Sequence, residues 1–88
     1  MKRIPIEAGR AVLSKAGRDA GRRFIVLRVE EPFCYIADGD LRKAEKPKKK
    51  KIMHLHALPD FYSAIAEAIG RGEMPMDAQL RRYLADRP

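Results

Sequence analysis

With 88 residues, 45% of them hydrophobic, the chain is long enough for one small domain with a thin core. A net charge of +7 favours an acidic partner, while a single cysteine, Cys34, excludes an intramolecular disulfide and fits a reducing cytoplasm. No apolar run approaches the ~20 residues that span a bilayer, and no apolar segment follows the basic residues near the N-terminus, so we expect a cytoplasmic protein that does not bind membranes.

The positive charge is confined to the first two thirds of the chain. Residues 1–58 carry 15 Lys and Arg against 7 Asp and Glu, whereas residues 59–88 carry 4 against 5. We therefore predict a basic β-rich domain over residues 1–58 and a helical extension over residues 59–88. Polyanions such as RNA or DNA are the expected partners of the basic part.

The first predicted strand covers residues 9–14, after an extended lead-in over residues 1–8. A basic loop follows over residues 15–23, bracketed by Gly17 and Gly21. Glycine takes positive φ without steric cost, so this short loop can reverse the chain.

The second predicted strand begins at Arg22 or Arg23 and ends at Glu30. Its apolar run, residues 24–27, shows little alternation, which indicates burial on both faces or a strand that curls around a small barrel. A buried helix segment would give the same run, but the β-branched residues and the preceding Gly21 favour a strand.

Three further strands are predicted in the basic part. A turn at residues 30–32 leads to a third strand over residues 33–37, and the tight turn Asp38-Gly39-Asp40 leads to a short fourth strand over residues 41–45. The lysine run at residues 46–51 is expected to be too self-repelling to pack, and residues 52–56 form the fifth strand. Five short strands with tight turns in about fifty residues are typical of a small SH3-like barrel.

The extension has a helical period. Its first helix has an apolar face, with a start signal at Pro59 and Asp60 and a stop at Gly70; that face comprises Phe61, Ala64, Ile65, Ala68 and Ile69. A second helix begins at Pro75 or Asp77 and has an apolar side of Leu80, Tyr83 and Leu84. Neither is long enough to be stable alone in water. We expect them to pack on the barrel rather than contact RNA, with docking of a protein partner as the alternative.

Residues 9–14, the loop with Gly17 and Gly21, and residues 24–29 together resemble a KOW motif, the β-loop-β unit of several ribosomal proteins and transcription elongation factors. The continuation over residues 37–43 and the Pro-Lys run at residues 47–51 resemble more particularly the branch related to ribosomal protein L14e, including small bacterial RNA-binding KOW proteins. The resemblance covers residues 7–57. It implies a five-stranded SH3-like barrel, a ribosomal or other structured RNA as ligand, and a ribosome-associated role in translation.

The candidate RNA-binding residues are the cations of the two basic segments, and Arg18 and Arg22 are the strongest because guanidinium matches phosphate bidentately and can stack on bases. Phosphate contacts would give affinity that is independent of sequence and falls with salt. A solvated surface that serves solubility is the alternative. The predicted set is Lys15, Arg18, Arg22, Arg23, Arg42, Lys43, Lys46, Lys48, Lys49, Lys50 and Lys51.

Phe33 and Tyr35 share one face of the third strand, and Cys34 and Ile36 share the other. One pair could be exposed, although packing in the core is favoured for both. The sequence therefore supports recognition of the backbone and shape of structured RNA more than reading of single-stranded bases.

Other chemistry is not favoured. His54 and His56 could be two metal ligands, but a zinc site needs about two more, and rim histidines are the preferred interpretation. Asp38-Gly39-Asp40 lacks the later ligands of a calcium loop. Cys34 reads as a small hydrophobe. We predict no enzyme, cofactor or metal; the alternatives to RNA binding are a protein-interaction module that docks through its barrel or C-terminal helices, and non-specific DNA binding.

Overall fold

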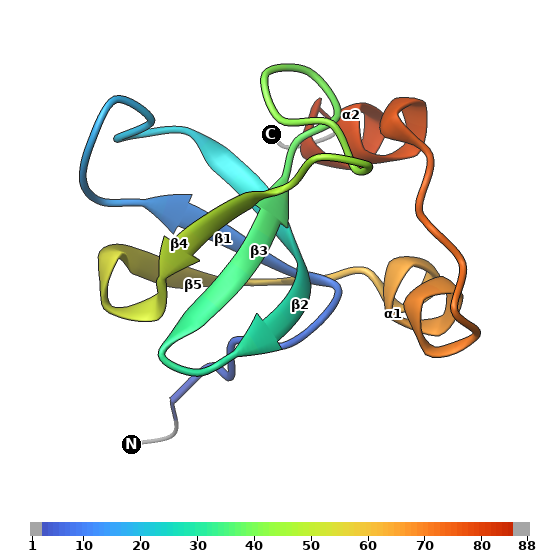
Figure 1. The fold of residues 1–88 in the computed structure, drawn as a ribbon, viewed down its shortest axis with the longest axis horizontal. Helices are drawn as coiled ribbons and strands as arrows, with labels where there is room; N and C mark the ends of the chain where they lie inside the picture. The colour runs from blue at the N-terminus through green and yellow to red at the C-terminus, as the bar shows by residue number, and fades with distance from the viewer. Residues whose placement is uncertain (1–2, 86–88) are drawn as a thin grey trace.

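The structure, a computed structural model, describes residues 3–85 and is mainly β: a five-stranded antiparallel sheet followed by two short helices (Figure 1). In the sheet the strand order is β4-β3-β2-β1-β5. The first two residues of the predicted lead-in and the last three of the predicted extension lie outside the described residues. The elements are β1 (Arg10–Ser14), β2 (Arg23–Glu30), β3 (Phe33–Ala37), β4 (Lys48–Lys51), a 3-10 helix η1 (Ile52–His54), β5 (Leu55–Phe61), α1 (Ser63–Gly70) and α2 (Asp77–Ala85).

The first three strands and the loop between the first two are confirmed. Gly17 and Gly21 have φ angles of +82° and +87°, so both adopt the left-handed conformation that lets the short loop reverse the chain. Residues 24–29 are strand, which excludes the helical alternative.

The fourth and fifth strands were placed wrongly. Residues 41–45 form turns, and the lysine run that was expected not to pack is itself β4, paired antiparallel with β3. The predicted fifth strand over residues 52–56 is displaced, because residues 52–54 form η1 and β5 then continues to Phe61. That continuation pairs Phe61 with Arg10 across β1, so Phe61 is not part of a helix.

β2 is the central element because it supplies both hydrophobic cores. Its alternate residues face a core inside the curled sheet and a second core under the helices, which confirms burial on both faces. Register shifts in β2 between Val26 and Arg28, and between β1 and β5, mark β-bulges that bend the sheet. The inner core contains Val12, Phe24, Val26, Cys34, Ile36 and Leu55, and the outer core contains Ile25, Leu27, Ala37, Ala44, Ile65 and Leu80.

The sheet is not closed into the expected barrel, because among residues 3–85 β4 and β5 are its two unpaired edges. The chain leaves β4 directly into η1 and does not return alongside it. Lysine side chains bridge part of the opening instead. Lys48 and Lys50 pair with Ile36 and Cys34, so they share the inner face and extend toward the β1–β2 loop.

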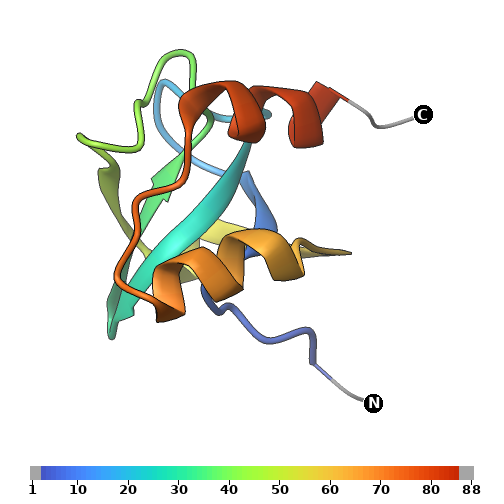
Figure 2. The ribbon, with the colours of Figure 1, turned by 90° about the vertical axis from the view of Figure 1, so that its right-hand side faces the viewer.

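Both helices lie on one side of the sheet (Figure 2). Ile65 of α1 and Leu80 of α2 are fully buried in the outer core, and Ile69, Tyr83 and Leu84 pack against it. The second predicted apolar side therefore packs, but only part of the first does, because Phe61 and Ala64 are exposed. The Tyr62 and Tyr83 rings stack at 4.6 Å and join the segments. No helix in the described part of the chain is long and apolar enough to cross a membrane.

The start of α1 differs from the predicted signal at Pro59 and Asp60, whereas its end agrees with the predicted stop. Tyr62 is its N-cap, without a side-chain capping bond, since residues 59–61 are still in β5. Its last residue is Gly70, as the predicted stop signal indicates, and Arg71 is the C-cap. Gly72 follows with φ of +78° and allows the Glu73 N–H to bond the Ala68 carbonyl oxygen at 2.8 Å.

Candidate nucleic-acid interface

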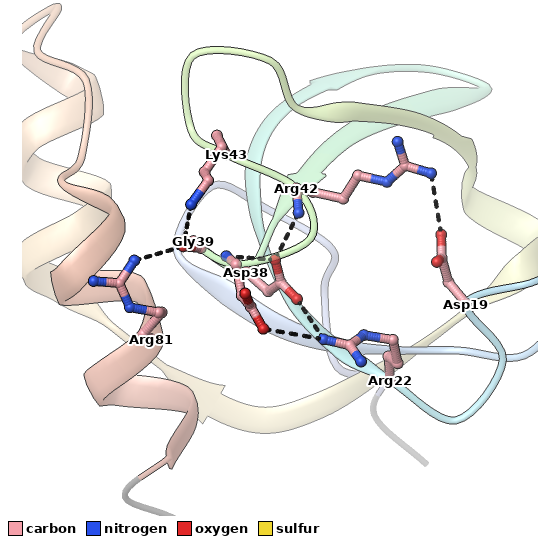
Figure 3. Close-up of polar contacts among 8 residues, drawn as sticks. Asp19, Arg22, Asp38, Gly39, Arg42, Lys43 and Arg81 are labelled. Atoms are coloured by element: carbon pink, nitrogen blue, oxygen red, sulfur yellow. Dashed lines mark hydrogen bonds and ion pairs between the residues drawn. The ribbon is translucent and has the colours of Figure 1, made fainter.

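The β1–β2 and β3–β4 loops lie side by side at one end of the sheet, where the buried carboxylate of Asp38 joins them (Figure 3). Its Oδ1 accepts hydrogen bonds from the backbone N–H groups of Asp40 (3.0 Å) and Arg42 (2.9 Å), and its Oδ2 accepts one from the Arg22 guanidinium (3.0 Å). Burial acts to raise the pKa of Asp38, but these hydrogen bonds outweigh it and lower the pKa below its usual value. Asp38 is therefore ionised, and its carboxylate holds both the turn at residues 38–42 and the Arg22 side chain in position.

Asp19 is the second buried carboxylate, only 4% exposed. Lys48 donates to it at 2.9 Å, and the Arg42 guanidinium lies 3.8 Å away (Figure 3). The hydrogen bond from Lys48 is the main reason that the pKa of Asp19 is lowered, despite burial. The neighbouring Lys50 donates to the Ala16 carbonyl oxygen at 2.8 Å. These lysines hold the glycine loop in place.

α2 is docked on the β3–β4 loop. Arg81 and Lys43 both donate to the Gly39 carbonyl oxygen, at 2.7 and 3.4 Å (Figure 3). Gly39 has φ of +78°, and a Cβ there would overlap the backbone carbonyl of Asp77. The Asp77 side chain in turn accepts a hydrogen bond from the Ala44 N–H at 2.7 Å. Close approach of two backbones is thus the reason for glycine at this position.

The predicted cations fall into three groups. Arg22, Arg42, Lys48 and Lys50 bind carboxylates or carbonyls of the protein itself. Lys43 makes a long bond to Gly39, and Lys49 lies over the Phe33 ring. The remainder have no protein partner for the side chain within residues 3–85; these are Lys15, Arg18, Arg23, Lys46 and Lys51.

We call the cations of the two loops, together with Arg81, the loop-end surface. It contains an open hollow of about 450 Å³ whose lining includes three arginines, Arg22, Arg23 and Arg81, and two aspartates, Asp38 and Asp40. The Arg22 guanidinium pairs with the carboxylates of Asp38 (3.0 Å) and Asp40 (3.9 Å), and Arg81 donates to the Gly39 carbonyl oxygen. Among the described residues, Arg23 is therefore the arginine of this hollow that is free to bind an incoming anion. The loop-end surface is Lys15, Arg18, Arg22, Arg23, Arg42, Lys43, Lys46 and Arg81.

A second group of cations and aromatics lies away from the loops, on the outer face of β2, β3 and β4. The Arg28 guanidinium carbon is 4.2 Å from the centre of the Tyr35 ring, and Lys49 Nζ is 4.4 Å from that of Phe33. Both rings are partly exposed, contrary to the core packing favoured from sequence. We call this group the sheet-face cluster: Arg28, Phe33, Tyr35, Lys49 and Lys51.

Sequence reasoning missed Arg81 and Arg28 as candidates. Nothing in the linear sequence indicates that α2 packs over the Asp38–Gly39 turn, so Arg81 could not be predicted as part of this surface. Arg28 faces outward because the bulge before it shifts the alternation of β2 by one residue. The parity of β3 was the available signal for Phe33 and Tyr35, because Cys34 and Ile36 are apolar and wholly buried.

The remaining candidates have structural explanations. Cys34 is fully buried, and burial raises the pKa of its thiol to about 11, so it remains protonated as a small hydrophobe. His54 lies in η1 and His56 in β5, so they do not share one strand face. No group of three potential metal ligands occurs within residues 3–85.

A scan against protein-family models and a search of curated proteins each found no match to this chain. The resemblance to KOW proteins therefore depends on the residues themselves.

Proposed function

We propose that this protein binds RNA, ribosomal or otherwise structured, through the loop-end surface, in a role related to translation. The observation that carries the proposal is the pair of buried carboxylates. Asp19 and Asp38 hold two basic loops together and leave Lys15, Arg18, Arg23 and Lys46 without protein partners for their side chains within residues 3–85.

The charge of this surface favours a polyanion. Its eight cations face four carboxylates, Asp19, Asp38, Asp40 and Glu45, leaving a net charge of +4. Two of the four are buried and already neutralised by their partners. Cations held on loops whose shape is fixed can meet phosphates with little further ordering, which favours recognition of a backbone with defined geometry.

The finer fold belongs to the same proposal. Five short antiparallel strands, a glycine loop after β1, and bulges that curl the sheet around an inner core support an open form of the SH3-like barrel of KOW type. The L14e-like resemblance over residues 7–57 favours RNA over DNA as the polyanion. The proposed docking face of Phe61, Ile65 and Ile69 does not form one exposed helical surface, because Ile65 is fully buried and Phe61 lies in β5.

The test compares Arg18→Ala with Arg71→Ala, which removes the same charge from an exposed site next to Glu73, at the end of α1. Binding to a structured RNA is measured over a salt series, with duplex DNA as competitor. We expect Arg18→Ala to weaken binding and to lower the slope of log K against log salt by ~0.7–0.9, the value for one phosphate contact. Arg71→Ala should change neither.

Equal effects of the two variants would show that the loop-end surface is not the site. Stronger competition by duplex DNA than by unlabelled RNA would favour non-specific DNA binding instead.

A further inference from the structure

The two helices cover only part of the outer face of the sheet. Ala37, at the end of β3, lies under them in the outer core with Ile65 and Leu80. Phe33 and Tyr35 project from the same face by strand parity, yet both are partly exposed. The helices therefore leave the rings of Phe33 and Tyr35 uncovered on this face.

Strand register places three cations and one carboxylate beside these rings. Tyr35 pairs with Arg28 on one side and Lys49 on the other. Phe33 pairs with Glu30 on one side and Lys51 on the other. Side chains directly opposite in neighbouring strands lie on the same face. The lysine run is thus divided by parity: Lys48 and Lys50 turn inward to the loop, whereas Lys49 and Lys51 stand beside the rings.

We propose that the sheet-face cluster binds a single-stranded segment of RNA, with bases stacked on Tyr35 and Phe33 and phosphates contacted by Lys49 and Lys51. This inference builds on the proposed RNA binding through the loop-end surface and adds a second contact of a different kind. A single strand that leaves a structured region would be the ligand.

Charge complementarity identifies the occupant as an anion that also carries flat apolar groups. Glu30, the carboxylate opposite Phe33, lies 3.2 Å from Arg28 and accepts a hydrogen bond from the Tyr35 hydroxyl at 3.4 Å. Within residues 3–85 neither Lys49 nor Lys51 forms an ion pair, so the three cations of the cluster outnumber this carboxylate. The two rings are about 7 Å apart along the strand, so successive bases of an extended chain can each meet one ring.

The cations over the rings do not block this use. The Arg28 side chain is 60% exposed, so it can move aside without losing buried contacts. Stacking of a base on an aromatic ring is stronger than an exposed cation–π contact. A displaced guanidinium or ammonium then lies beside the phosphate of the stacked nucleotide and can form a charge-assisted hydrogen bond with it.

A hollow next to Tyr35 offers room for a further base. It measures about 390 Å³; its walls are mostly apolar, among them Leu27, Ile69 and Met74, and also include the charged residues Arg28 and Glu73. A mostly apolar hollow beside a stacking ring suits a nucleobase, and the volume falls within the range of small-ligand sites.

The test measures binding of labelled oligouridylate and of a blunt RNA duplex to the full chain. Tyr35→Leu and Phe33→Leu remove the rings and keep apolar volume. We expect each to weaken oligouridylate binding at least about 5-fold, with duplex binding unchanged. Tyr35→Phe keeps the ring and should bind like the parent.

Phe61→Leu is the matched control. Phe61 is 41% exposed and lies under the guanidinium of Arg10 at 5.1 Å, so it reproduces an exposed ring with a cation above it at another site. It should not affect oligouridylate binding. Photo-crosslinking of iodouridine-substituted oligonucleotide to the parent chain should label the peptide that contains Phe33 and Tyr35, without any need for a variant to fold.

The outcomes separate the two proposals. Oligouridylate binding that survives both ring substitutions, with crosslinks elsewhere, would overturn the sheet-face site while duplex binding through the loops stands. Parallel loss of both ligands, with a lower melting temperature, would show that the rings serve packing and would also overturn it. A parent chain that binds neither RNA refutes both proposals.

Discussion

Two carboxylates inside the basic part of the chain organise its positive charge. Asp38 accepts hydrogen bonds from two backbone N–H groups and from Arg22, and Asp19 receives Lys48 and lies near Arg42. Each is almost wholly buried. Buried charges are tolerated when they are paired and hydrogen-bonded, so the acidic residues are what allows several cations to converge at one end of the sheet.

The lowered pKa of Asp38 has a predictable effect on stability. Since the folded-state pKa lies below the unfolded value of about 3.9, the carboxylate stabilises the fold above pH 4, and this contribution is lost as pH falls through the folded-state pKa. Asp38→Asn should therefore lower the free energy of unfolding at neutral pH, by about 1–3 kcal/mol, and the difference from the parent should shrink in acid.

Urea denaturation over a pH series measures this effect. Asp40→Asn is the control, because Asp40 lies 3.9 Å from the same arginine but its side chain is 70% exposed. A surface change of this kind should stay within about 0.5 kcal/mol. A pH-independent deficit in Asp38→Asn would mean that shape, not ionisation, matters at this site.

Among the elements, β4 is made entirely of lysine, and its inward and outward faces differ in their contacts. Lys50 is buried and binds the Ala16 carbonyl oxygen, whereas the side chain of its neighbour Lys51 is exposed and has no partner within residues 3–85. Long lysine stems bury apolar carbons while the ammonium group reaches a polar partner. Edge strands also commonly carry lysine, which discourages pairing with other chains.

Lys50→Ala and Lys51→Ala therefore make a matched pair. We expect Lys50→Ala to destabilise the fold by about 1–3 kcal/mol, because it leaves the Ala16 carbonyl without its donor and removes buried carbons. Lys51→Ala should change stability by less than about 0.5 kcal/mol. Chemical denaturation of the two proteins checks the difference, and equal stabilities would contradict the inward role of Lys50.

The elements that the sequence predicts correctly are those whose signals are local to the segment, and the others depend on contacts with distant residues. Apolar content and glycine spacing are local, so β1, β2, β3 and the β1–β2 loop were predicted correctly. β4 was missed because the stability of a lysine strand comes from partners about thirty residues away, Ala16 and Asp19, and like-charge repulsion is all that the run itself suggests. The strand predicted over residues 41–45 was wrong for the same reason. The Arg42 N–H donates a hydrogen bond to the Asp38 side chain, and this contact bends the segment into a turn.

The candidate site shows the same division. The net charge located the basic loops, but which cations are free depends on tertiary contacts. Arg22 was a leading candidate and is taken up by Asp38, whereas Arg18 is exposed and has no side-chain partner in the described part of the chain. Arg81 comes from a helix outside the basic segment, and only the docking of α2 at Gly39 brings it to the loops.

For the whole molecule, β2 makes the helices and the sheet parts of one folding unit. Ile25 and Leu27 face the helices, while Phe24 and Val26 face the inner core. Loss of either layer would expose one side of the same strand. A small chain has little stability in reserve, so we expect the sheet and the helices to unfold together.

Ile65→Ala tests this cooperativity. Ile65 of α1 is fully buried against β2, and truncating a buried isoleucine lowers the free energy of unfolding by about 2–5 kcal/mol. In a domain of this size a loss of 1 kcal/mol lowers Tm by roughly 4–8 °C, so Tm should fall by at least about 8 °C. Met76→Ala, at a side chain that is 70% exposed, is the control and should leave Tm nearly unchanged. Thermal unfolding is followed by circular dichroism at a strand-sensitive and a helix-sensitive wavelength. Coincident transitions, both lowered in Ile65→Ala, are the expected result; loss of the helix signal alone, with the strand transition unmoved, would show that the helices are a dispensable layer.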